Sequence, residues 1–152
     1  MSIDVKKIKE LREETGAGVV EIKNMLEEVE GDYKRAKAEL MKKAASKAEK
    51  KQDREASEGL VCSYIHHGGE VGSMVLISCE TDFVAKTDDF KKLSQEVAMQ
   101  VCTEDYKDVK ELLDSEYIRD PSKKVRDLVN EATAKLGEKI ELKKFVKYSV
   151  GD

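Results

Sequence analysis

Two apolar segments joined by a glycine-containing turn constrain the fold of this chain more than any other feature. Residues 60–66 (LVCSYIH) and 71–79 (VGSMVLISC) are rich in β-branched and other apolar residues, and β-branched side chains pack well on the pleated surface of a sheet. Residues 67–70 (HGGE) lie between them, and paired glycines tolerate the backbone angles of a tight hairpin turn. The sequence therefore predicts an antiparallel β-hairpin.

The chain before residue 55 has a helical pattern instead. Apolar residues recur at helical spacing over residues 5–11, 20–29 and 33–41. Glycines at 16, 18 and 31 interrupt this pattern, so we expect three short helices in a bundle over residues 1–42, with Val5 and Val20 among the inward side chains. Residues 43–56 retain helix-favouring Ala, Lys and Glu without an apolar stripe, and predict an exposed helical linker.

After the hairpin the pattern is helical again and then returns to a strand. Thr87 is expected to cap a helix over 88–102, a short helix is expected at 109–113, and Pro121 and Ser122 are expected to open a helix that ends at Gly137. Apolar residues at even positions from 140 to 150 predict a third strand. The expected fold is therefore α+β, with a core over residues 57–152 in which helices cover a three-stranded antiparallel sheet.

Composition and charge narrow the class of function. The chain has 152 residues and a net charge of −4, which gives no general reason to expect nucleic acid or an anionic membrane as a partner. No segment approaches the roughly 18 apolar residues of a membrane span, and the first residues lack the apolar core of a signal peptide. We therefore expect a cytoplasmic protein whose three cysteines, at 62, 79 and 102, are buried free thiols.

The polar residues form no arrangement typical of an enzyme. Gly16-Ala17-Gly18 is not followed by a phosphate-binding Lys-Ser/Thr pair, and the only histidines, His66 and His67, have no Cys or carboxylate at a ligand spacing. We expect no catalytic residue, metal or cofactor. Residues 34–54 carry nine Lys and Arg against three Asp and Glu, which is consistent either with a solvated linker or with a surface for an anionic protein or RNA.

The stretch 78–86 (SCETDFVAK) follows the second strand and precedes the helix that begins after Thr87. A connection of this kind lies at the surface and often carries function. Phe83 has two interpretations. Composition alone favours a core position, whereas a Phe projecting from a rigid loop beside Asp82 is the usual anatomy of a binding hot spot.

Four segments in this order resemble the elongation factor Ts family: LREETGAGVVEIKNML, EVEGDYKRAKAEL, ASEGLVCSYIH and CETDFVAK. The resemblance implies a ubiquitin-associated-like three-helix bundle, an α+β core, and guanine-nucleotide exchange on elongation factor Tu without enzymatic chemistry. The chain has room for one core subdomain, so it is similar to the short form of the family, which forms homodimers. Neither nucleic acid nor a membrane is required as a partner.

The resemblance also implies roles for particular residues. Phe83 would be a wedge that enters the G domain of the partner beside the nucleotide and its magnesium, with Asp82 as its polar neighbour and Thr81 and Val84 framing both. Arg12 and the pair Val19-Val20, which stands where the family usually has two methionines, would contact the same G domain. The alternatives are a ubiquitin-like or nascent-chain binding module within residues 1–54, and an RNA-binding protein that uses the lysines of residues 42–54.

Overall fold

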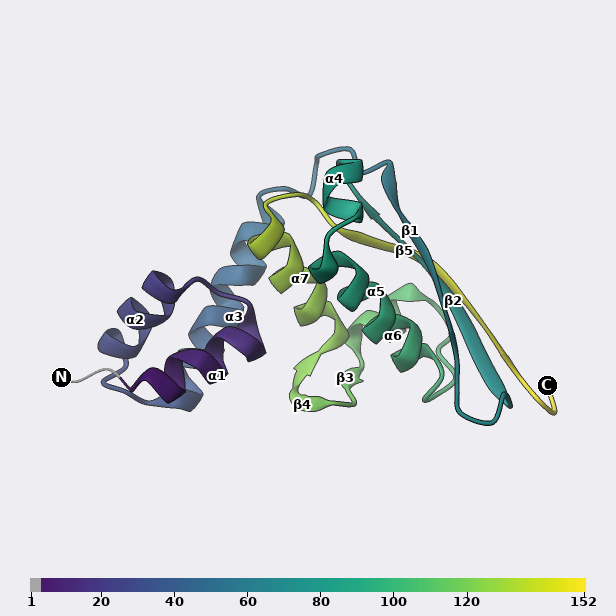
Figure 1. The fold of residues 1–152 in the computed structure, drawn as a ribbon, viewed down its shortest axis with the longest axis horizontal. Helices are drawn as coiled ribbons and strands as arrows, with labels where there is room; N and C mark the ends of the chain where they lie inside the picture. Colours follow the sequence, from purple (N-terminus) through teal and green to yellow (C-terminus); the bar gives the residue numbers. More distant parts are fainter. Residues whose placement is uncertain (1–3) are drawn as a thin grey trace.

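The amino-terminal part of the chain is a bundle of three helices. A computed structural model describes residues 4–152, and the bundle consists of α1 (Val5–Thr15), α2 (Val19–Glu28) and α3 (Tyr33–Glu49) (Figure 1). Asp4 and Asp32 each accept a main-chain N–H at the start of a helix, and Gly16 ends α1 with a φ of 71°, an angle that costs glycine little. The bundle core contains Ile8, Leu11, Ile22, Met25, Leu26, Val29, Ala36 and Leu40.

Two valines expected inside the bundle lie on its surface. The exposed fractions of Val5 and Val20 are 77% and 70%. Each stands in the first turn of its helix, outside the bundle core. The prediction of inward side chains was therefore wrong at these two positions, although the three helices themselves are confirmed.

The last turns of α3 were expected to be an exposed linker, but one side of them is buried. The helix continues to Glu49 and packs along α7 (Val125–Leu136), and Ala44 is buried. Alanine is small enough to be buried between two closely packed helices without forming the apolar stripe that marks most buried helix faces. The expectation of exposure holds for the outer side of this helix, at Lys42, Lys43, Ser46, Lys47 and Glu49.

A three-stranded antiparallel sheet forms the second part of the molecule, as predicted. Its strands, in the order β1-β2-β5, are β1 (Glu58–Ile65), β2 (Val71–Cys79) and β5 (Glu141–Ser149). The predicted hairpin joins β1 to β2, with Leu60 opposite Ile77 and Ile65 opposite Gly72. Figure 1 shows the three strands as a long ribbon whose far tip lies beside the carboxy terminus, at the end of the molecule opposite to the bundle.

A β-bulge divides β5 into two halves. Leu142 lies opposite Ile77, but the next pair along joins Lys144 to Leu76, so one extra residue stands in β5. The insertion exchanges the two faces of the strand. Leu142 is buried, whereas Val146 beyond the bulge is 40% exposed. The even-numbered residues therefore do not share one face, which corrects the pattern expected from the sequence.

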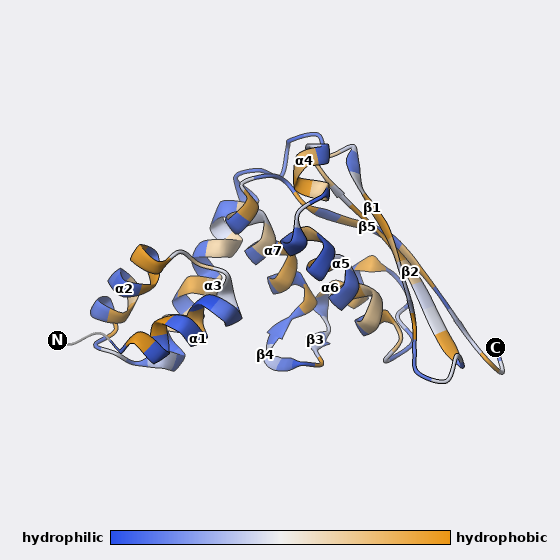
Figure 2. Ribbon diagram, in the orientation of Figure 1, coloured by the Kyte–Doolittle hydropathy of each residue, from blue (hydrophilic) through white to orange (hydrophobic). Residues whose placement is uncertain are grey.

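Helices cover one face of the sheet and enclose the larger apolar core. α4 (Asp82–Ala85), α5 (Asp88–Val101) and α6 (Val109–Asp114) contact the sheet, and α7 packs against α5 and α6. The core that these elements enclose includes Val75, Ile77, Phe90, Val97, Leu112, Val125 and Leu142. Figure 2 shows apolar segments on α7 and along the strands. As expected, the side chain of Thr87 caps α5 by accepting the N–H of Phe90 at 3.2 Å.

The segment that contains Pro121 is a strand and not the start of a helix. β4 (Asp120–Lys124) pairs with β3 (Glu116–Tyr117) in a small hairpin, and α7 begins only at Val125. The carboxylate of Asp127 accepts the N–H of Lys124 at 2.8 Å and so stabilises this later start. Among residues 4–152, no helix is both long enough and apolar enough to cross a membrane.

Candidate partner-binding site

Phe83 projects from the short helix α4 into solvent. Its side chain is 83% exposed, the most exposed of the large apolar residues described. Val84 and Ala85 on the same helix are only 9% and 5% exposed and belong to the core cluster. The core position that composition favours for Phe83 was wrong, because the helix turns Val84 inward instead. An exposed aromatic ring on an anchored base is the arrangement found at binding hot spots.

Local hydrogen bonds define the start and end of α4. Thr81 precedes the helix, and its hydroxyl accepts the N–H of Val84 at 3.3 Å. The hydroxyl of Thr87 donates to the carbonyl of Val84 at 2.7 Å. Asp82 and Lys86 form an ion pair of 3.5 Å on the exposed side of the helix, which contributes little in water. The sequence predicted a loop at 80–86, but these threonines support one helical turn.

A reciprocal pair of carboxylates holds the start of α4 against the segment just before β5. The carboxylate of Glu138 accepts the N–H groups of Glu80 and Thr81 at 3.1 and 3.0 Å, and the hydroxyl of Thr81 at 2.7 Å. In return, the carboxylate of Glu80 accepts the N–H of Lys139 at 2.6 Å. We call this set the Glu80–Glu138 clasp. Hydrogen bonds to ionised carboxylates are stronger than neutral ones, so the clasp gives Phe83 a rigid base.

Sequence reasoning did not identify the clasp. Glu80 stands in the quoted stretch, but its partner Glu138 lies 58 positions away in the chain. The only available signal was a carboxylate directly after Gly137, next to the predicted third strand. The antiparallel pairing of β2 with β5 brings the two segments together.

The cysteines are free thiols, as expected, but only one of them is buried. Cys79 is buried, whereas Cys62 and Cys102 are half-buried. The thiol of Cys79 donates to the carbonyl of Thr81 at 3.1 Å. Burial, together with the nearby Glu138 carboxylate, raises the pKa of Cys79 to about 11. Cys79 therefore stays protonated near neutral pH and stabilises the turn into α4.

The predicted site residues differ in accessibility. Asp82 and Phe83 are exposed, Thr81 is half-buried within the clasp, and Val84 is buried. The expected framing contact from Val84 is therefore not available at the surface, because this side chain anchors α4 in the core.

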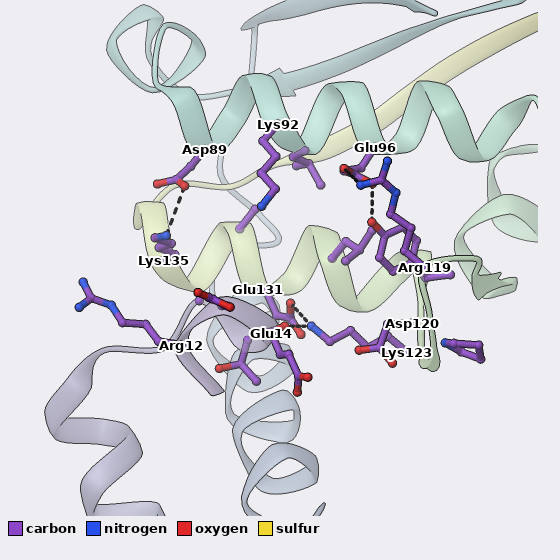
Figure 3. Close-up of a pocket in the computed structure, with 18 of the residues that line it drawn as sticks. Arg12, Glu14, Asp89, Lys92, Glu96, Arg119, Asp120, Lys123, Glu131 and Lys135 are labelled. Carbon is purple, nitrogen blue, oxygen red and sulfur yellow. Dashed lines mark hydrogen bonds and ion pairs between the residues drawn. The ribbon is translucent and has the colours of Figure 1, made fainter. Parts of the chain in front are cut away.

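The second predicted contact lies on the bundle. Arg12 is exposed in the last turn of α1, Val19 is half-buried against the bundle core, and Val20 is exposed at the start of α2. Figure 3 shows the guanidinium of Arg12 pointing away from the Lys123–Glu131 pair. Figure 1 shows α2 and α4 in different parts of the molecule. The structure therefore presents two separate surfaces and does not join them into one patch.

Residues 4–152 give little support for a metal site or for RNA binding. Within residues 4–152, no group of three or more His, Cys, Asp and Glu side chains is placed to hold a metal ion. His66 and His67 are exposed at the hairpin turn. Four of the cations in residues 34–54 form ion pairs, which reduces the positive field that RNA would require. They are Lys37 with Asp120, Lys42 with Glu39, Lys47 with Glu21 and Arg54 with Glu80.

A cleft of about 830 Å³ lies between α1 and the helices of the core (Figure 3). Charged side chains of both signs line it, and several of them pair across it. Lys135 meets Asp89 at 3.2 Å, and Arg119 meets Glu96 at 3.1 Å. A cleft with balanced charges is not suited to a strongly charged small ligand. These two pairs lie within the core, whereas Lys123 in the same lining donates to the carbonyl of Glu14 and so joins the core to the bundle.

The amino-acid sequence is similar to one protein family and to several of its members. A family model described as Elongation factor TS matches residues 80–152. An elongation factor Ts from Coprothermobacter proteolyticus is 37% identical over 197 aligned positions, covering all of both chains. One from Thermotoga neapolitana is 38% identical over 195 positions, covering all of this chain and 99% of the relative. These alignments exceed 152 positions, so both relatives have residues that this chain lacks. A relative from Nostoc sp. is 42% identical over 150 residues, which are 99% of this chain and 47% of that protein.

Proposed function

The chain belongs to the elongation factor Ts family of translation elongation factors, and from that premise we propose that it promotes GDP release from elongation factor Tu. The observation that carries the proposal is the exposed Phe83 on a helix that the Glu80–Glu138 clasp anchors. A wedge must be rigid to displace part of another protein, because a flexible side chain would move aside instead. This arrangement supplies that rigidity.

In the proposed mechanism Phe83 enters the G domain of elongation factor Tu, and Asp82 accepts a hydrogen bond beside it. The ring displaces the helices that position the magnesium and phosphate-binding groups. GDP then loses both the neutralising cation and the main-chain N–H donors that hold its phosphates. GDP therefore leaves faster. Thr81 and Val84 contribute from within this chain, because they hold α4 in place.

The bundle provides a second contact to the same G domain. Arg12 supplies a cation, and Val20 supplies an apolar surface that Val19 supports from the bundle core. In this proposal residues 1–42 are the bundle domain, 43–56 are the linker, and 57–152 are the core domain that carries the wedge.

Exchange of this kind breaks no covalent bond. The proposal therefore requires no catalytic acid, base or nucleophile, and no cofactor of this chain's own. It does require reciprocity: if this protein weakens GDP binding by some factor, GDP weakens the binding of this protein by the same factor. The complex is tight without nucleotide and dissociates as nucleotide accumulates. The site of action is the cytoplasm, where translation takes place, without a membrane or nucleic acid as a required partner.

The proposal includes a homodimer. β5 is an edge strand of the sheet, and an unpaired edge can accept another copy. The face of the sheet that the helices leave uncovered also carries exposed apolar side chains, namely Val61, Ile65, Met74, Val146 and Tyr148. A second copy that covers this face would remove those side chains from water and place two wedges in one assembly.

Stopped-flow release of a fluorescent GDP from elongation factor Tu tests the exchange proposal. Wild type is expected to accelerate release, and Phe83→Ala is expected to lose roughly tenfold or more of that acceleration, because aromatic hot spots carry a large part of binding energy. Phe83 is exposed, so the variant is expected to keep its circular dichroism spectrum and unfolding midpoint.

Ile118→Ala is the matched control. Ile118 is another exposed apolar residue, 57% exposed, on the turn between β3 and β4, and its loss is expected to leave the release rate unchanged. Equal rates for wild type and Phe83→Ala would remove Phe83 from the mechanism. No acceleration by wild type would refute exchange as the function.

A further inference from the structure

A buried lysine joins the bundle to the core. Lys123 of β4 is 3% exposed. Its ammonium donates to the main-chain carbonyl of Glu14, in the last turn of α1, and pairs with the carboxylate of Glu131 on α7 at 2.8 Å (Figure 3). Carbonyls in the last turn of a helix have no partner within it and carry partial negative charge. Lys123 satisfies one of them from the other side of the domain boundary.

A second lysine, on the bundle, contacts the core. Lys37 of α3 pairs with Asp120 of β4 at 2.6 Å and with the carboxylate of Glu14 at 3.3 Å. Tyr33 donates to the same Glu14 oxygen at 2.6 Å, and Ser122 donates to Asp120 through both its N–H and its hydroxyl. Each lysine therefore contacts one element of the bundle and one of the core. We call Glu14, Lys37, Asp120, Lys123 and Glu131 the seam network.

Apolar packing at this boundary is limited. The buried apolar residues form two separate clusters, one within the bundle and one within the core. Where α3 lies along α7, the small side chains of Ala44 and Ala134 line the space between them. Small side chains let two helices approach but supply little interdigitation to set their angle. Charged hydrogen bonds have narrow preferred distances and directions, so the seam network is the part of the boundary that specifies orientation.

We infer that the seam network positions the bundle on the core so that Val20 and Phe83 engage one partner molecule together. The inference rests on the proposed function. Two contacts carried on one rigid body behave as a bivalent ligand, since formation of the first raises the effective concentration of the second. That gain requires the correct geometry and is lost when the two parts reorient. The five residues are therefore positioning residues, which act through the two contacts.

The test uses the full chain with three substitutions, Lys37→Met, Lys123→Met and Glu131→Leu. Glu131 is removed together with Lys123 because a buried carboxylate without its partner would destabilise the core by itself. The control is Arg126→Met, which removes a 2.8 Å ion pair with Asp114 that lies wholly within the core. In formal charge, with every carboxylate counted as ionised, each variant is one unit more negative than wild type.

Residual dipolar couplings measure the orientation directly. One alignment tensor is expected to fit α1, α2 and the sheet together in wild type and in the control. The triple variant is expected to need two different tensors while each part keeps its own internal couplings. A single tensor in the wild-type orientation for the triple variant would overturn the inference. If the triple variant does not fold, Asp120→Ala, at a half-buried position, replaces it in the test. The couplings of α1 and α2 are then expected to depart from the wild-type orientation. Unchanged couplings in Asp120→Ala would also overturn the inference.

GDP release provides the second measurement. The triple variant is expected to need roughly tenfold more protein for half-maximal acceleration, while the maximal rate stays within about twofold because Phe83 is intact. An unchanged half-maximal concentration, despite two tensors, would separate the seam network from partner binding and refute the inference. If wild type itself gives no acceleration, the proposed function fails, and the couplings still decide whether the seam network sets the orientation.

Discussion

Among single residues, Glu131 has an ionisation that affects stability near neutral pH. It is 9% exposed, and its Oε1 atom is the one buried side-chain N or O atom without a hydrogen-bond partner in residues 4–152. Burial raises the pKa of Glu131 to about 7, because desolvation outweighs the attraction of Lys123. Asp127 on the same helix raises this pKa further, whereas Lys37 on α3 lowers it. The carboxyl group is therefore half-protonated near neutral pH.

This pKa predicts how stability depends on pH. An unfolded Glu has a pKa of about 4.3, so the folded chain binds this proton more tightly. The stabilisation is complete below about pH 4.3 and is lost as the pH rises through 7. Relative to Glu131→Gln, wild type is expected to lose roughly 2–4 kcal/mol of unfolding free energy between those limits. Urea unfolding at a series of pH values measures this difference, and parallel profiles for the two proteins would contradict it.

Among the secondary-structure elements, α4 depends most on its surroundings. A helix of four residues is far too short to be stable alone, so the clasp and the buried Val84 must hold it. Glu138→Ala leaves the N–H groups of Glu80 and Thr81 without their acceptor. We expect a loss of about 1–3 kcal/mol in unfolding free energy and a clear loss of GDP-release acceleration, although Phe83 itself is unchanged.

Amide hydrogen exchange locates this effect. In Glu138→Ala, the amides from residue 81 to residue 87 are expected to lose protection, while those of α5 keep it. Glu141→Ala is the control, because within residues 4–152 the Glu141 carboxylate forms ion pairs only with Lys139 and Lys143, at 3.9 and 3.0 Å. Retained protection in Glu138→Ala would mean that core packing of Val84 alone suffices to hold α4.

At the scale of the whole molecule, the uncovered face of the sheet predicts self-association. Tyr148 is 74% exposed on β5. Tyr148→Glu is expected to keep the monomer folded and to shift the dimer towards monomer by tenfold or more in dissociation constant, since a charge would be buried in the interface. Sedimentation velocity measures the shift. Val5→Glu, at a valine 77% exposed on the bundle, is expected to remain dimeric, and a monomeric wild type would refute the dimer.

The sequence alone was sufficient for most elements and for their order. The three bundle helices, the hairpin and the cap of Thr87 were predictable because each depends on a local period, a glycine or a nearby side-chain oxygen. The family was also identifiable from the sequence, since the resemblance rests on contiguous stretches such as CETDFVAK. The error at Pro121 arose because β4 is stabilised by pairing with β3, which local propensity does not report.

Tertiary structure alone decided which side chains are available for binding. The period of a four-residue helix is too short to show that Phe83 faces outward and Val84 inward, so packing against the core determined this. Residues far apart in the chain likewise form the Glu80–Glu138 clasp, the seam network and the β2–β5 pairing in which the bulge occurs. Such contacts depend on how whole elements pack, and a carboxylate or lysine looks the same in the sequence whether it is solvated or buried with a partner.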